Sequence, residues 1–62
     1  PMAFLRSIRL QKARLSLAAA DPAASTVTEI ALACGFSHMG EFSVAYRRTF
    51  GETPRETLLR SA

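Results

Sequence analysis

Cysteine, histidine and tryptophan are scarce: the 62 residues include one cysteine, one histidine and no tryptophan. A single cysteine, Cys34, excludes a disulfide within the chain and a cluster of thiolate metal ligands. Its place in a helical apolar pattern predicts a small, buried hydrophobic side chain. No apolar run approaches the ~20 residues needed to cross a membrane, and nothing resembles a signal peptide. Composition therefore excludes a disulfide-stapled scaffold.

Groups that could carry out catalysis are equally scarce. His38 is the one histidine, and no set of nucleophile, base and metal ligands accompanies it. A lone histidine at the start of a helix is typical of a solvated polar side chain. No glycine-rich phosphate loop of the nucleotide-binding kinds occurs. We therefore expect no enzyme, no metal site and no cofactor.

Size and charge limit the classes of protein that remain possible. A chain of 62 residues makes one domain at most and buries only about 60% of its unfolded surface. Eight Lys and Arg against five Asp and Glu leave a net charge of +3 and a pI near 10.0. That excess suits a polyanionic partner, although it also fits an inert basic domain. The chain begins with proline, so we expect an excised piece of a longer protein.

Helix start and stop signals predict an all-α fold of about four helices. The first runs over residues 2–20 and ends at Asp21-Pro22, because a residue before proline avoids helical geometry. The run Thr26-Val27-Thr28-Glu29 is a capping box that opens the second helix. Gly35 ends it, because glycine takes the left-handed position after a helix most easily.

The third and fourth helices have signals of their own. Ser37 is the best candidate to cap the third helix, which runs to about Phe50 and stops at Gly51. Thr53-Pro54-Arg55-Glu56 then supplies a cap, a proline at the first helical position and a completing glutamate. The fourth helix extends to about Arg60. Two helices joined by a glycine corner are typical of a helix-turn-helix, whose second helix enters the DNA major groove.

The first helix carries two apolar stripes, whereas a surface helix normally needs one. The later helices can cover one stripe, and the other then needs a neighbour that this sequence does not contain. Alternatively, a partly exposed helix with scattered leucines explains the pattern. One stripe contains Leu10, Ala13, Leu17 and Ala20, and the opposite one contains Phe4, Ile8 and Leu15, with Leu5 at its margin.

The third helix has an apolar side and an outward side. Phe42, Tyr46 and Phe50 stand at i, i+4 and i+8, a stripe typical of a core. Val27, Ile30, Ala31 and Cys34 supply the facing surface, and Phe36 can fill the corner. The outward side is then formed by His38 or Met39, Gly40, Glu41, Val44, Arg47 and Arg48.

Three motifs together are similar to those of the AraC/XylS family of bacterial transcription regulators. They are Arg9-Leu10-x-x-Ala13-Arg14-x-x-Leu17, Glu29-Ile30-Ala31-x-x-Cys34-Gly35-Phe36-Ser37, and Phe42-x-x-x-Tyr46-Arg47-Arg48-x-Phe50-Gly51-x-Thr53-Pro54. The resemblance covers residues 1–60. It implies that residues 1–62 form the C-terminal half of a DNA-binding domain, with a linker helix at 1–20 and a second helix-turn-helix with a closing helix at 26–60.

The resemblance also implies partners and site residues. The expected partners are double-stranded DNA, a first helix-turn-helix N-terminal in the same parent chain, and RNA polymerase, all in the bacterial cytoplasm. We expect phosphate contacts from Ser37, the amide end of the third helix, Arg47 and Arg48. The expected base-facing residues are His38, Met39, Gly40, Glu41 and Val44.

Five residues depart from the family pattern, namely Met39, Gly40, Glu41, Val44 and Thr57. Val44 stands where the family often has arginine, Glu41 can only accept hydrogen bonds, and Thr57 replaces an aromatic in the last helix. Two interpretations stay open for Arg47 and Arg48, which fit phosphate contacts or a solvated face. An alternative function is a helical protein-interaction module in which a missing first helix-turn-helix makes most DNA contacts.

Overall fold

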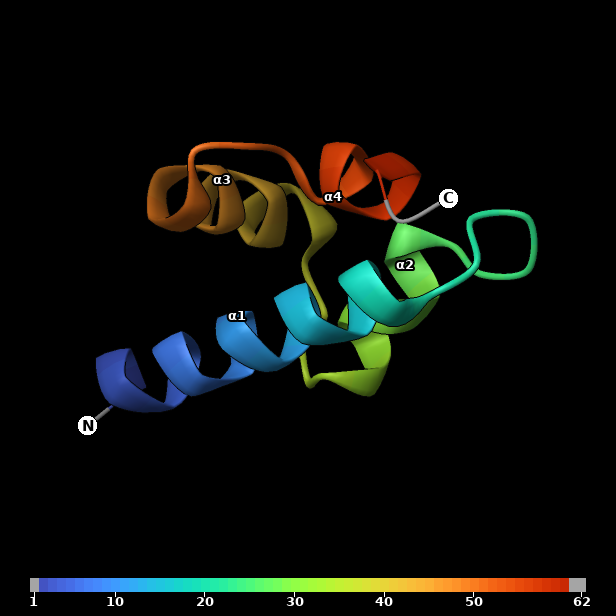
Figure 1. Cartoon of the computed structure of the whole chain (residues 1–62). Helices are drawn as coiled ribbons and strands as arrows, with labels where there is room; N and C mark the ends of the chain where they lie inside the picture. Colours follow the sequence, from blue (N-terminus) through green and yellow to red (C-terminus); the bar gives the residue numbers. More distant parts are fainter. Residues whose placement is uncertain (1, 61–62) are drawn as a thin grey trace.

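A computed structural model describes residues 2–60, with side chains from residue 3 onward. Every element in that range is a helix, so the prediction of an all-α fold is confirmed (Figure 1). Residue 1 and residues 61–62 of the expected domain lie outside the described range. The helices are α1 (Met2–Ala19), α2 (Val27–Ala33), α3 (Met39–Phe50) and α4 (Pro54–Arg60).

Two capping boxes set the starts of α2 and α4, as the sequence predicts. The Glu29 amide donates to the Thr26 hydroxyl at 3.2 Å, and the Thr26 amide donates to the Glu29 carboxylate at 3.1 Å. The same exchange joins Thr53 and Glu56, at 2.9 Å and 3.2 Å. Because the first amides of a helix lack partners within it, each box satisfies donors that would otherwise be open.

Glycines end α2 and α3 in the left-handed region, also as predicted. Gly35 has φ 95° and Gly51 has φ 77°, and no other described residue has a positive φ. The Gly51 amide donates to the Arg47 carbonyl at 2.8 Å, which closes the last turn of α3. Positive φ is costly for most residues with a side chain, so these positions favour glycine.

The predicted cap of α3 is wrong by one residue. His38, not Ser37, is the N-cap, with extended φ −117° and ψ 101°, and its side chain makes no capping hydrogen bond. The preceding Phe36 ring packs at 4.7 Å from the Phe42 ring. Ser37 therefore precedes the cap, in the corner where Phe36 packs against Phe42.

The helices enclose one small core. As Figure 1 shows, α1 lies below α3 and α4, and α2 crosses it; α1 packs on α2 and α4, whereas α1 and α3 approach each other least. One apolar stripe of α1 is buried and the other is exposed, with Phe4 65% exposed and Leu15 69% exposed, which fits both interpretations of this helix. Cys34 is a free, half-buried thiol that packs against the core. The buried apolar residues are Leu10, Ala13, Leu17, Ala31, Phe42, Tyr46 and Leu58.

A chain of polar contacts joins α3 to α4 inside this core. The Tyr46 hydroxyl lies 2.7 Å from the Thr57 hydroxyl, and Thr57 in turn donates to the Glu52 carboxylate. Arg60 pairs with the same carboxylate from the outside. Thr57 therefore joins the last helix to α3 through hydrogen bonds, at a position where the family pattern has an aromatic residue.

Candidate nucleic-acid interface

The glycine corner presents the outward side of α3 to solvent. Seven of the eight predicted contact residues are exposed, and Val44, near the middle of this side, is 52% exposed. Met39 is the exception, because it is half-buried and packs against the core. The exposed seven are Ser37, His38, Gly40, Glu41, Val44, Arg47 and Arg48.

Gly40 leaves the surface of α3 open near its N-terminal end. A Cβ atom built at this residue would have no heavy atom within 4 Å, and its φ is not positive. Neither the fold nor the backbone conformation therefore requires glycine here. What glycine provides is a place where another molecule can approach the helix backbone closely.

Arg47 and Arg48 lie on different flanks of α3. Arg48 lines an open groove toward α1, which we call the flank groove. Arg47 stands one position earlier, about 100° around the helix, so its side chain leaves α3 on the other side of Val44. The flank groove has a volume of about 300 Å³ and is lined by Arg6, Gly40, Glu41, Val44, Ala45 and Arg48.

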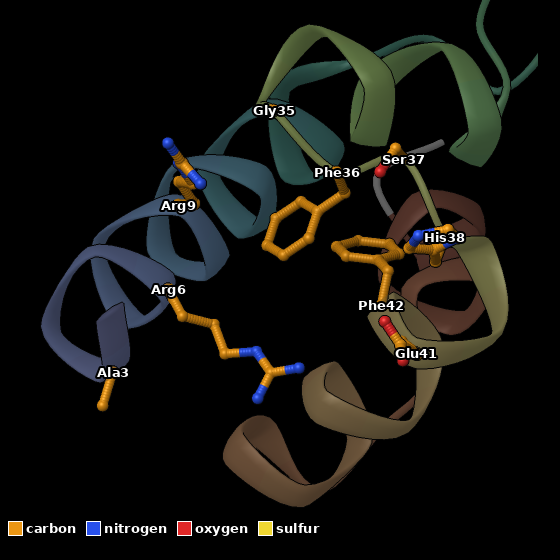
Figure 2. A pocket seen from close by; sticks show the side chains of 9 residues that line it. All are labelled: Ala3, Arg6, Arg9, Gly35, Phe36, Ser37, His38, Glu41 and Phe42. Carbon is orange, nitrogen blue, oxygen red and sulfur yellow. The ribbon is translucent and has the colours of Figure 1, made fainter. Parts of the chain in front are cut away.

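A second groove runs between the start of α1 and the glycine corner, as Figure 2 shows; we call it the corner groove. Arg9 lies against Gly35, with its Nε 3.3 Å from where a Cβ would stand. Arg6 reaches from α1 toward α3 in the same view. The lining residues are Ala3, Arg6, Arg9, Gly35, Phe36, Ser37, His38, Glu41 and Phe42.

Sequence reasoning did not place Arg6 or Arg9 beside α3. A signal was available for Arg6, which stands four positions before Leu10 and seven before Ala13. Residues at that spacing share one face of a helix, so Arg6 continues the buried stripe of α1 beyond the core. Arg9 contributes to the corner groove because the turn at Gly35 passes directly over it.

The arginines of this surface have no carboxylate partner. Across residues 2–60, the one ion pair joins Arg60 to Glu52, away from both grooves. Guanidinium groups offer donors in a planar fork that matches the oxygens of a phosphate. Among these same residues, no three His, Cys, Asp or Glu side chains gather as metal ligands. The arrangement suits binding of an extended anion.

No described helix is long and apolar enough to cross a membrane. A family model described as "Helix-turn-helix domain" matches residues 1–60. No solved structure matches the chain.

Several curated bacterial proteins are similar over most of the chain. The "Probable thc operon regulatory protein" of Rhodococcus erythropolis is 53% identical over 58 residues, which are 94% of this chain and 18% of that protein. "XylDLEGF operon transcriptional activator 2" of Pseudomonas putida is 41% identical, over 94% of this chain and 37% of its own length. "HTH-type transcriptional activator RhaS" of Escherichia fergusonii is 45% identical, over 90% and 19%. The chain thus spans between 18% and 37% of these relatives.

Proposed function

The chain belongs to the AraC/XylS-type helix-turn-helix family of DNA-binding transcription regulators, and from that premise we propose that α3 enters the major groove of double-stranded DNA. One observation carries this proposal. The exposed surface around Gly40 and Val44 has Arg48 on its α1 side and Arg47 on the other side of the helix. A helix in the major groove has a phosphate strand on each side, so guanidinium groups on both flanks fit it.

Different residues of this surface are proposed to contact the phosphates and the bases. We propose Ser37, Arg47, Arg48 and the amide end of α3 for the phosphates, since no side chain caps that end. His38, Gly40, Glu41 and Val44 are the base-facing candidates. Met39 can take part only with the exposed part of its side chain. Because Val44 and Gly40 donate no side-chain hydrogen bonds, most of the reading is apolar contact and shape.

The place of this chain in a larger protein is part of the same proposal. We assign residues 1–20 as the linker helix and residues 26–60 as the second helix-turn-helix of a two-unit reader. The exposed apolar stripe of α1, with Phe4, Ile8 and Leu15, is then the docking surface for the first unit. RNA polymerase is a further proposed partner of the whole protein, which would work in the bacterial cytoplasm as a binding protein without catalysis.

The protein-interaction alternative is not favoured. The family model and the named regulators and activators cover nearly the whole chain. The exposed leucines of α1 that suggested a separate partner lie opposite the core stripe, away from α3. Both surfaces can therefore serve one reader domain, one toward DNA and one toward its own first unit.

Salt titration of duplex binding tests the proposed function. In the full-length protein, Arg47→Ala and Arg48→Ala are expected to weaken binding to selected and random duplexes alike. Each lost phosphate contact lowers the log-log salt slope by about one unit. If both variants keep the slope and the affinity of the wild type, the two arginines belong to a solvated face and the proposal fails.

A further inference from the structure

Arg6 brings a guanidinium from α1 to the recognition helix. The buried stripe of α1 begins at Leu10, and the helix extends past the core toward its N-terminus (Figure 1). Arg6 stands on that stripe one turn earlier, so it faces the same side as the core residues but remains exposed. Its side chain therefore points toward α3 and not toward the exposed apolar face of α1.

Both grooves of the interface share this residue. Arg6 lines the corner groove with Ser37 and His38, and it also lines the flank groove with Val44 and Arg48. In Figure 2 its side chain spans the space between α1 and α3, the pair of helices that approach least. No other α1 residue lines both grooves.

The local charges favour an anion there. Arg6 and Arg48 line one groove, and within the described chain neither makes an ion pair. Two guanidinium groups on one groove repel each other, so neither stabilises the other in the free protein. Glu41 is the carboxylate that lines both grooves, and it also lies outside ion-pair distance of Arg6. An anion placed along the groove would be attracted by both arginines.

We propose that Arg6 is a further phosphate-binding residue, which together with Arg48 holds one strand of the duplex along the α1 flank of α3. This inference rests on the proposed function, and it gives α1 a second task beyond connecting two units. Phosphate contacts fix the position and register of a protein on DNA. A contact from α1 would therefore set the angle at which α3 lies in the groove.

The test compares three variants in the full-length protein. Arg6→Ala removes the guanidinium, Arg6→Lys keeps a charge that can bind phosphate, and Lys12→Ala removes a charge from an exposed α1 position that lines neither groove. Affinity is measured over a range of salt for a random duplex and for a duplex recovered by selection. Thermal midpoints are recorded for every variant.

Arg6→Ala is expected to weaken both duplexes by a similar factor and to lower the salt slope by about one unit. Arg6→Lys should retain the slope, and Lys12→Ala should match the wild type in slope and affinity. All three should keep the wild-type thermal midpoint, because both positions are exposed.

Three results would overturn the inference. An unchanged slope for Arg6→Ala, alongside a lowered slope for Arg48→Ala, removes Arg6 from the interface and leaves the proposed function standing. A loss of affinity that disappears in a Glu41→Gln background shows that Arg6 only neutralises that carboxylate. Binding by the wild type that does not depend on salt contradicts the proposed function itself.

Discussion

The hydroxyls of Tyr46 and Thr57 meet at 2.7 Å inside the core, joining α3 to α4. Thr57 donates its own proton to the Glu52 carboxylate, so Tyr46 is the donor in the pair. Tyr46 is fully buried and Thr57 is 7% exposed. Because a buried hydroxyl without a partner is costly, the two residues depend on each other.

Thr57→Val should destabilise the protein by about 1–3 kcal/mol, because it leaves the Tyr46 hydroxyl buried without an acceptor. Tyr46→Phe removes the donor, so adding it to Thr57→Val should recover part of the loss. Unfolding by denaturant measures all three proteins and the wild type. A double variant that is as unstable as the sum of the single variants would mean that the two hydroxyls are not coupled.

Alkaline pH should destabilise the fold through the same tyrosine. Burial is the main cause that raises the pKa of Tyr46 above its ordinary value of about 10. The folded state then holds the proton more tightly than the unfolded state, so the free energy of unfolding falls as pH rises above ~10. Tyr46→Phe should remove this part of the fall. Identical pH profiles for the variant and the wild type between pH ~9 and ~11 would contradict the assignment.

Gly35→Val should cost about 1–3 kcal/mol of stability, since a β-branched residue is forced into the left-handed region at φ 95°. Arg9 lies 3.3 Å from the new Cβ, but its flexible side chain can move aside. Backbone strain is therefore the main cause. Gly35→Asn is the matched control, because asparagine tolerates positive φ better and should lose less. Equal thermal midpoints for Val, Asn and wild type would show that the corner is not strained.

Gly40→Ala should have opposite effects on stability and on DNA binding. A Cβ at this position meets nothing, and alanine is favoured over glycine by about 1 kcal/mol in a helix interior, which is an upper limit for Gly40 in the first turn of α3. If DNA approaches the backbone there, the added methyl group should weaken duplex binding while the thermal midpoint rises. A variant that is stabilised and binds DNA with unchanged affinity would place Gly40 outside the contact.

Helix ends were predictable wherever one residue type satisfies the local backbone, as at Thr26, Gly35, Gly51 and Thr53. The start of α3 was predicted one residue too early. The capping preference depends on residue type and favoured Ser37, whereas His38 holds the cap position without a side-chain hydrogen bond.

The outward side of α3 could be predicted from the helical period and the position of the aromatic core stripe. The contribution of α1 to the interface could not be predicted in the same way. It depends on how α1 and α3 cross, which the sequence of either helix does not give. Thr57 shows the same limit: a polar residue in a core position gains stability only through partners that the fold brings to it.

The central claim is that the outward side of α3 reads the major groove, and Val44→Arg in the full-length protein tests it most directly. Arginine pairs with O6 and N7 of guanine, which discriminates by about 1–3 kcal/mol against the wrong base. Leu59→Arg is the control, because Leu59 is 54% exposed, close to the 52% of Val44, but lies on α4. The measurement is a selection from randomised duplexes with both variants and the wild type. The account predicts a new guanine preference at one base pair for Val44→Arg alone, and a Val44→Arg profile that matches the wild type or Leu59→Arg would contradict it.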